Sequence, residues 1–438
     1  MKYVRDKKIR YAVCLALLCA GIFFVTDFSK SNPLKSNSVL TIGVFSDSYW
    51  NTANGYSHRM INDAINKYEA ENPQIKVVYE SGILKEDYSE WLAEQMMNGE
   101  APDVFFILPE DMNTMVGADA LEDLTAFIRS DKDFDPEGFY EAAYGYGSVD
   151  SYQYSLPFEC APELMFVNRS LLENEGMEMP ERDWKWEDFR SICESVTRDS
   201  DLNGTTDQFG VANYRWEEAF ASNDVELFNE AGTECCFTDE KVGNALAFLD
   251  SLEGVNIRNT GSTDYFEHGN VAFQPMYYSN YRAYVSNPVH ASRYADFEWD
   301  FLTMPAGTDG DNSSRLDTLS VAMYSGSGMK DEAWDFIKLL TCDEEIQSEI
   351  FKYSEGVSPR IRITETELMK NHHQSYETLV YAMTHAVSKH RFYGYNEAMN
   401  AVDISVEEIL NGNGNLRMEQ IIQSRSINTF LKTLRNNH

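Results

Sequence analysis

The chain has 438 residues, of which 43% are hydrophobic and 24% are charged. This indicates a globular protein of roughly two to three domain-sized units. Its 36 basic and 71 acidic residues give a formal net charge of -35, which argues against a nucleic-acid partner because phosphate binding needs a cationic surface. The same charge argues against an anionic ligand.

The first 28 residues predict a signal peptide or a membrane anchor. Basic residues up to Arg10 precede residues 11–26, which carry no charge. A basic segment followed by an apolar one directs export. Residues 29–38 are polar and predict a tether. We therefore expect an exported protein at the extracellular face of the membrane, either anchored there or secreted.

The folded part begins with alternating strands and helices. Residues 38–45 predict a buried strand, and residues 61–68 carry an apolar stripe of helical period. Strands are predicted at 75–80 and 101–108, with a second amphipathic helix between them that ends at Gly99. This order predicts a mostly parallel sheet with helices on both faces, whose ligands bind beyond the carboxyl ends of the strands.

Helices dominate the predicted elements of the second half. A helix is expected within residues 184–199, and a long helical region over 331–356 is stopped by Gly356. Leu379, Met383 and Val387 recur at helical spacing. The last helices are predicted within residues 404–434 and are separated by a Gly/Asn turn.

Eight stretches in the right order resemble one family. They include "TIGVFS" with "AINKYEAENPQIKVVYE", "GEAPDVFFI", "LPFECAPELMFVNRSLLENEGMEMP", "FEHGNVAFQPMYYSNY", "WDFLTMPAG", "AWDFIKLLTCDEEIQ", "EGVSP" and "EEILNGNG". Together they are similar to the extracellular solute-binding proteins of family 1, the sugar-capturing subunits of ATP-driven importers. The resemblance extends from about residue 40 to the end of the chain.

The resemblance implies an α/β fold of the periplasmic-binding-protein-like type II, with two lobes joined by hinge crossings. By analogy, lobe one comprises residues 39–157 plus 317–356, and lobe two comprises residues 158–316 plus 357–438. Ligand is expected between the lobes, which close by hinge bending.

A neutral sugar offers hydroxyl groups to polar side chains and a C–H face to aromatic rings. The family pattern points to three pairs of aromatic residues as the ligand-binding candidates: Tyr49 and Trp50, Tyr277 and Tyr278, Tyr214 and Trp216. Each pair has the alternative that its rings pack in the core instead of lining the site.

Three carboxylates are candidates for binding sugar hydroxyls, because a carboxylate accepts strong hydrogen bonds from vicinal hydroxyls. Glu110 and Asp111 follow the third predicted strand, and Glu159 lies at the presumed first crossing. The alternative for Glu110 is an acidic residue at a helix N-terminus that faces solvent. Asp103, at the start of the apolar strand, is expected to be structural.

"DSDLNGTTDQFG" has the spacing of a calcium loop. Positions 1, 3, 5 and 9 of such a loop are occupied by Asp199, Asp201, Asn203 and Asp207, with Gly204 at position 6. Position 12 is Gly210 instead of the usual glutamate. This spacing makes Ca²⁺ a candidate ion. The alternative is a plain Asp/Asn/Gly turn that binds no ion. We expect the protein to require no cofactor.

We expect a monomeric, non-enzymatic protein that captures a neutral sugar and delivers it to ABC permease subunits. Two alternatives remain open: a sensor that passes the bound-ligand signal to a membrane kinase, and an exported glycoside hydrolase with two carboxylates across a bond. The sequence carries no G-x-S-x-G elbow, H-E-x-x-H helix or P-loop.

Overall fold

The computed structural model describes residues 38–50, 57–229, 231–258, 264–286, 297–370, 376–387, 391–392, 394–412 and 414–436. The predicted signal peptide or anchor lies outside the described residues, as does all of the predicted tether except Ser38. None of the described helices is long and apolar enough to cross a membrane.

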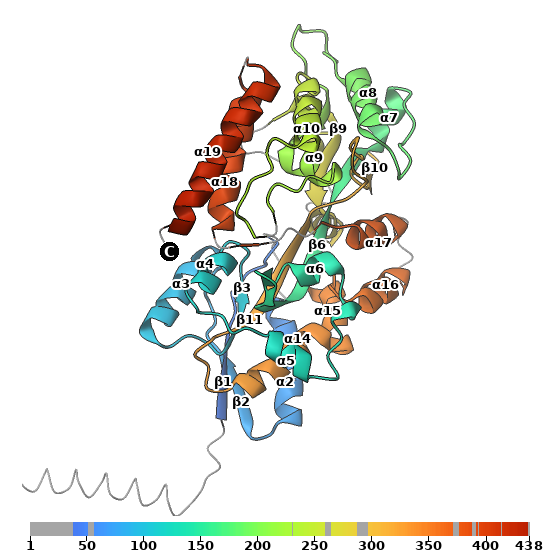
Figure 1. Ribbon diagram of the computed structural model, residues 1–438. Helices are drawn as coiled ribbons and strands as arrows, with labels where there is room; N and C mark the ends of the chain where they lie inside the picture. The colour runs from blue at the N-terminus through green and yellow to red at the C-terminus, as the bar shows by residue number, and fades with distance from the viewer. Residues whose placement is uncertain are drawn as a thin grey trace, which may run out of the picture.

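Two lobes share one nine-stranded sheet (Figure 1). Its strand order is β2-β1-β3-β11-β6-β9-β7-β8, and β10 pairs with β6 beside this path. The predicted α/β two-lobed fold is therefore confirmed.

Lobe one is built on three parallel strands, since β1 pairs in parallel with both β2 and β3. Its strands and principal helices are β1 (Ser38–Gly43), α2 (Ser57–Glu71), β2 (Ile75–Tyr79), α3 (Lys85–Asn98), β3 (Val104–Ile107), α14 (Lys330–Cys342) and α15 (Glu344–Tyr353). The long predicted helical region divides at Asp343, which has extended backbone and accepts hydrogen bonds from the Glu345 and Ile346 N–H groups. This side chain caps α15 and so ends α14.

Two antiparallel strands carry the chain between the lobes. The strand β6 (Ser155–Asn168) is buried along its whole length. Its first half pairs with β11 (Leu316–Met323), and its second half pairs with β9 of lobe two. The sequence predicted the parallel strands but not that these crossing strands would be antiparallel to their neighbours.

In lobe two, β7 pairs in parallel with both β8 and β9, so their carboxyl ends lie at one edge. Its strands and principal helices are α8 (Trp186–Val196), β7 (Phe209–Ala212), α9 (Trp216–Ser222), α10 (Glu240–Ser251), β8 (Asn256–Ile257), β9 (Val271–Tyr277), β10 (Trp299–Leu302), α18 (Tyr395–Leu410) and α19 (Leu416–Asn436). The predicted pair of C-terminal helices is α18 and α19.

Shorter elements complete the chain: α4 (Met112–Gly117), α5 (Thr125–Ser130), η1 (Pro136–Gly138), α6 (Glu141–Gly145), β4 (Ser148–Val149), β5 (Tyr152–Gln153), α7 (Arg169–Asn174), α11 (Asp264–Glu267), α12 (Tyr278–Ser286), α16 (Ile361–Lys370) and α17 (Tyr376–Thr384). Leu379 and Met383 are buried in α17, but Val387 lies beyond its end and forms a β-bridge with Arg315. The helical prediction for Val387 is wrong, because backbone pairing with the chain before β11 takes over there.

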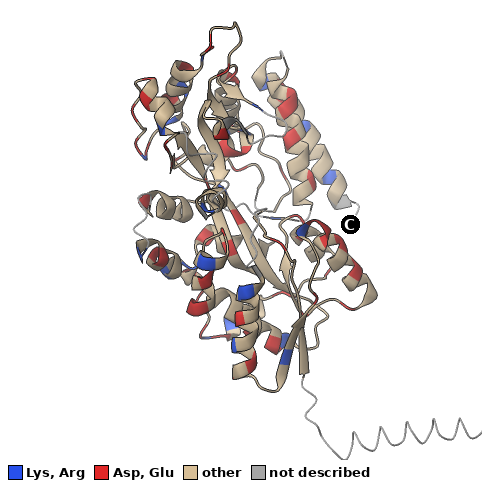
Figure 2. Cartoon of the chain, turned by 180° about the vertical axis from the view of Figure 1, so that it is seen from behind, with Lys and Arg blue, Asp and Glu red and all other residues tan. Residues whose placement is uncertain are grey.

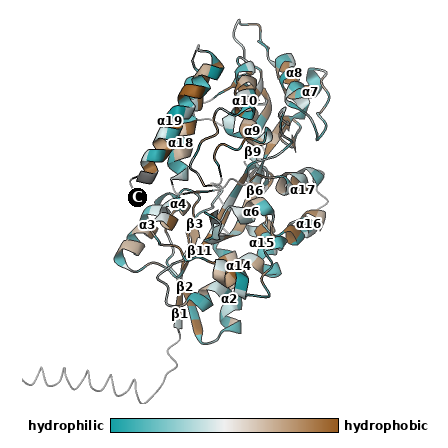
Figure 3. Ribbon diagram, viewed as in Figure 1, coloured by the Kyte–Doolittle hydropathy of each residue, from teal (hydrophilic) through white to brown (hydrophobic). Residues whose placement is uncertain are grey.

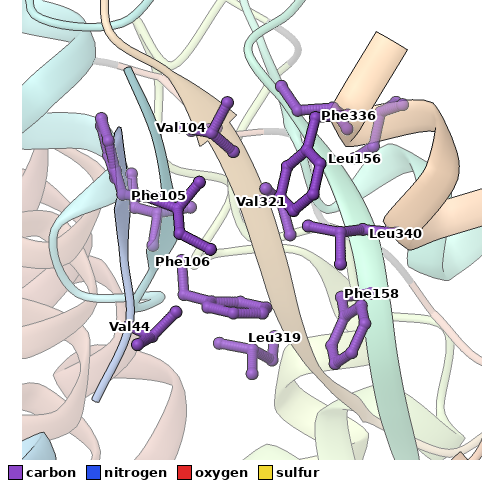
Figure 4. Close-up of a cluster of buried hydrophobic side chains, with 14 of the residues drawn as sticks. Val44, Val104, Phe105, Phe106, Leu156, Phe158, Leu319, Val321, Phe336 and Leu340 are labelled. Carbon is purple, nitrogen blue, oxygen red and sulfur yellow. The ribbon is translucent and has the colours of Figure 1, made fainter. Parts of the chain in front are cut away.

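Each lobe has its own hydrophobic core. In lobe one, Phe106, Phe158 and Leu319 come from three neighbouring strands and approach one another (Figure 4). Hydrophobic residues occur along the strands, and the helices carry both hydrophilic and hydrophobic residues (Figure 3). Acidic residues, coloured red, occur on the helices of both lobes (Figure 2), in keeping with the net charge of -35.

Candidate ligand-binding site

Tyr49 joins the loop after β1 to the hinge strand β11. Its hydroxyl donates a hydrogen bond of 2.7 Å to Asp317 Oδ1. Lys85, the first residue of α3, donates from Nζ to the Tyr49 carbonyl at 2.6 Å and lies 5.2 Å from the centroid of its ring. Burial and the nearby Asp317 carboxylate raise the pKa of the Tyr49 hydroxyl well above its usual value, so this group remains a donor.

Trp50, Glu159 and Gly356 form a tight corner beside the hinge. The Trp50 ring stands edge-on to Tyr49, with 4.7 Å between the ring centroids. A Cβ at Gly356 would lie 2.8 Å from Glu159 Oε2 and 2.9 Å from Trp50 Nε1, so only glycine allows this approach. The Ser354 hydroxyl donates to Glu159 Oε2. Burial raises the pKa of Glu159 to about 7, against the opposing hydrogen bond from Ser354.

A small cavity lies between this corner and α2. Its volume is about 40 Å³, which leaves room for a few water molecules but not for a sugar ring. Its lining includes Phe45, Asp47, Tyr49, His58, Phe106, Phe158, Glu159, Leu319, Tyr353 and Ser354. The residues that line this cavity must therefore move before a sugar could enter it.

A buried ion cluster lies at the same hinge. Arg315 donates from Nε and Nη2 to the Glu163 carboxylate at 2.8 and 2.7 Å, and from Nη2 to Glu218 Oε1 at 2.5 Å. Glu163 belongs to β6 and Glu218 to α9. Both carboxylates are buried, and burial raises the pKa of Glu218 while the Arg315 charge opposes this. These ion pairs connect β6 and the residue before β11 to α9 of lobe two.

A second set of contacts joins the lobes directly. Arg391 donates from Nη1 to the Pro109 carbonyl at 2.9 Å, and the Asn396 amide donates to the Glu110 carbonyl at 2.8 Å. The Arg391 guanidinium also lies 4.2 Å from the centroid of the Tyr146 ring. The neighbour of Arg391, Phe392, belongs to the core of lobe two. These contacts stabilise the closed arrangement.

We expect Arg391→Ala to shift the ligand-free protein toward a more open form. The variant loses a charge-assisted hydrogen bond and a cation–π contact, which together change the open-to-closed ratio about tenfold or more. Small-angle X-ray scattering would show this as a larger radius of gyration. Arg190→Ala is the control, because the ion pair of Arg190 with Glu194 lies on the surface of α8. Identical scattering from the two variants would contradict the closing role of Arg391.

Residues 55–346 match the family of bacterial extracellular solute-binding proteins. The match covers more than half of the chain. The chain belongs to this family.

Solved structures with the same fold cover nearly the whole solute-binding protein. One is an ABC substrate-binding protein from Listeria monocytogenes in complex with cycloalternan, with 20% identity, a TM-score of 0.70, and coverage of 90% of this chain and 99% of that chain. Another is the sugar-binding protein MalE from Xanthomonas citri, with 16% identity, a TM-score of 0.72, and coverage of 91% and 98%. A third is a cyclic alpha-maltosyl-1,6-maltose binding protein from Arthrobacter globiformis, with 14% identity, a TM-score of 0.75, and coverage of 90% and 99%.

The structure of this solute-binding protein brings several predicted site residues together near the hinge. Tyr49, Trp50 and Glu159 are neighbours there, as described above. Glu110 has an exposed side chain, and its backbone contacts Asn396. Asp111 accepts a hydrogen bond of 2.6 Å from the Ser89 hydroxyl, and burial raises its pKa.

The remaining predicted aromatic residues divide between the hinge and the core of lobe two. Tyr277 lies beside the ion cluster, with the Arg315 guanidinium 6.0 Å from its ring centroid. Tyr278 stacks on Tyr281 within a buried cluster. Tyr214 is fully buried, and its hydroxyl accepts from Trp186 Nε1 at 3.2 Å. These positions favour the packing alternative for Tyr214 and Tyr278.

Trp216 is buried but borders a larger pocket of about 450 Å³ in lobe two. Its indole N–H donates to Asp403 Oδ1 at 2.8 Å. The pocket is lined by Asn213, Arg215, Trp216, Leu249, Arg258, Asp403, Glu407 and Leu410. Asn213 and Arg258 directly follow β7 and β8, so this pocket lies at the carboxyl edge of the lobe-two strands.

The calcium-like loop places Asp199, Asp201 and Asp207 carboxylate oxygens within 4.8 Å of one another. Asp199 accepts from the Asn203 and Gly204 N–H groups, and Asp207 accepts from Ser200. These bonds satisfy the carboxylates within the loop and equally suit a plain turn. Calcium binding at this loop, with Asn203 as a fourth ligand, stays a prediction.

Sequence reasoning missed Asp317, Arg315, Tyr146 and Arg391. The chain was expected to pass from lobe two to lobe one between residues 316 and 317, so Arg315 and Asp317 beside this boundary could have been recognised as candidates. Charged residues in a buried hinge strand need partners, and both of these residues contact the elements that surround the candidate site.

Proposed function

We propose that this solute-binding protein captures a neutral carbohydrate, preferably an oligosaccharide, between its two lobes and delivers it to the permease of an ABC importer. The observation that carries the proposal is the family match over residues 55–346. The solved relatives support the ligand class, since one was determined with cycloalternan and another is a sugar-binding MalE.

The chemistry of the hinge region supports a carbohydrate. Tyr49, Tyr146 and Tyr277 supply rings for the C–H faces of sugar units, and Asp317 and Glu159 supply acceptors for hydroxyl groups. Both guanidinium groups nearest these rings are already engaged, Arg315 by carboxylates and Arg391 by a carbonyl and a ring. The larger pocket beside Trp216 could accommodate further units of an extended ligand.

In this proposal, ligand binding is coupled to opening and closing of the two lobes about the hinge. Opening would break the contacts that Arg391 and Asn396 make with lobe one, and closure over the ligand would restore them. A ligand favours the closed form only to the extent that it binds that form more tightly than the open one. The permease would then recognise the closed form.

The family consists of extracellular proteins, so this chain is exported. We further propose that it acts as a monomer held at the membrane by its N-terminal segment.

A thermal-shift panel tests the function directly. The soluble part of the chain from residue 39 would be heated with neutral mono- and oligosaccharides, and each stabilising sugar would be recovered for product analysis. A ligand at about a hundred times its Kd adds about 2.7 kcal/mol to the free energy of unfolding. We expect one class of oligosaccharide to stabilise the protein and to be recovered intact. Recovery of cleaved sugar would show a hydrolase, and no shift with any sugar would contradict carbohydrate binding.

A further inference from the structure

Asp317 is an acidic residue of a hinge strand whose carboxylate lies in the candidate site. It lies in the hinge strand β11, directly opposite Ala161 of the other hinge strand, β6. Its Oδ1 atom accepts hydrogen bonds from the Tyr49 hydroxyl at 2.7 Å and from the Thr318 N–H at 2.8 Å. Both donors belong to lobe one, and the strand opposite Asp317 is the one that leads into lobe two.

The second oxygen of this carboxylate is available. Within the part of the chain that the structure describes, no donor is hydrogen-bonded to Asp317 Oδ2. The side chain is half-buried rather than sealed from solvent. A half-buried carboxylate with one unoccupied oxygen is well suited to accept hydroxyl groups from a ligand, and the bond is charge-assisted.

Three tyrosines lie within range of the negative charge of Asp317, and Tyr49 is bonded to it directly. Its charge acts on the hydroxyl groups of Tyr49, Tyr146 and Tyr277, which come from the loop after β1, the end of α6 and the end of β9. Lys85 also lies within range of its charge. The Tyr49 ring, whose hydroxyl is bonded to Asp317, therefore stands beside this acceptor, and a ring beside an acceptor is the combination that a sugar unit requires.

The positive charges near Asp317 do not outweigh the negative ones. The charge of Arg315 is offset by Glu163 and Glu218, while Lys85 keeps its single positive charge and donates to the Tyr49 carbonyl. Glu110 adds a further negative charge within range of Tyr49 and Lys85. An anionic ligand would have to approach Asp317 against these carboxylates.

We propose that Asp317 is the central hydroxyl acceptor of the site and that it makes the protein select neutral sugars and reject sugars that carry carboxylates. This inference rests on the proposed function and specifies its ligand. Because Asp317 is part of the hinge strand, a sugar bound to it also touches the element about which the lobes turn.

Isothermal titration calorimetry with three trisaccharides tests the inference. Maltotriose and mannotriose are the neutral probes, and trigalacturonic acid is the anionic probe. The wild-type protein is expected to bind a neutral probe at least tenfold more tightly than trigalacturonic acid. This arm needs no variant, so it is independent of any folding defect.

The variant arm compares Asp317→Asn with Asp250→Asn, which makes the same charge change at an exposed position of α10. We expect Asp317→Asn to weaken neutral-probe binding about 10- to 100-fold, because a charge-assisted hydrogen bond is lost. The same variant should narrow the gap between neutral and anionic probes, while Asp250→Asn should match wild type. Thermal unfolding of both variants shows whether they fold.

The possible results distinguish the role of Asp317 from sugar binding by the protein as a whole. Equal neutral-probe affinity in folded Asp317→Asn and Asp250→Asn would overturn the role of Asp317 while leaving sugar binding intact. Wild-type affinity for trigalacturonic acid equal to or above that for the neutral probes would overturn the charge selection. Failure of every sugar to bind the wild-type protein would contradict the proposed function itself, and the inference would fall with it.

Discussion

Replacing Arg315 with methionine is expected to lower the free energy of unfolding by about 3–5 kcal/mol. The substitution leaves Glu163 and Glu218 without their cation. Their side chains are only 5% and 3% exposed, so water cannot take its place. A buried carboxylate without a partner must either stay charged at a large desolvation cost or bind a proton. The loss should therefore be smaller near pH 5 than near pH 8. Denaturant unfolding at the two pH values measures both effects.

Arg198→Met is the matched control for this experiment. Arg198 also forms a short ion pair, with Glu175, but its own side chain is 54% exposed. Exposed ion pairs contribute about 0–1 kcal/mol, so this variant should change stability little. The combined variant Arg315→Met, Glu163→Gln, Glu218→Gln should recover much of the loss, since it removes the unpaired charges together. A loss in Arg315→Met no larger than in Arg198→Met would show that the cluster does not stabilise the fold.

Local pattern was sufficient to predict the parallel part of lobe one. The apolar stripe of α2 and the buried runs of β1 and β3 have clear periods, so their residues could be placed from sequence alone. Asp103 is a further example. It was expected to be structural, and its carboxylate accepts hydrogen bonds from Thr41 and Ser327. In these places the local pattern indicates the role of a residue, although the partners of Asp103 lie 62 and 224 positions away in the chain.

The contacts at the hinge could not be predicted in the same way. Glu163, Glu218 and Arg315 lie in three separate elements, and no period in the sequence links them. Tyr214 and Trp216 show a second difficulty, because an aromatic residue after a strand suits a core and a ligand site equally well. Tyr214 turned into the core between Trp186 and Phe248, while Trp216 reached the edge of a pocket. Tertiary packing alone decides between these positions.

Stability is expected to fall as the pH rises from about 5 to about 8, with Glu159 as the main cause. Burial raises its pKa from 4.5 to about 7. The folded state therefore holds a proton that the unfolded state has already released in this range. The resulting stabilisation is present below pH 4.5 and is lost as the pH passes 7, and the difference between the two pKa values corresponds to about 3 kcal/mol. Burial raises the pKa of Glu218 as well, which acts in the same direction.

Glu159→Gln isolates this contribution, because glutamine resembles the protonated acid in shape and does not titrate. The free energy of unfolding of the variant should depend less on pH between 5 and 8 than that of the wild type, by up to about 3 kcal/mol. Glu194→Gln, on the surface of α8, is the control and should keep the wild-type slope. Equal slopes in all three proteins would mean that the Glu159 carboxyl titrates normally. Asp131 does not interfere, because Lys338 lowers its pKa to about 2, so its contribution is lost only in stronger acid.

The same carboxyl group lines the cavity beside Tyr49, so its proton should respond to ligand. A sugar hydroxyl that donates to Glu159 would stabilise the charged form and lower the pKa of this group. Binding near pH 7 would then release a proton, and the measured binding enthalpy would differ between buffers of different ionisation enthalpy. Glu159→Gln should abolish that difference. A wild-type binding enthalpy that is the same in every buffer would place the ligand away from Glu159, and the site would then have to be built around Asp317 and the rings of both lobes.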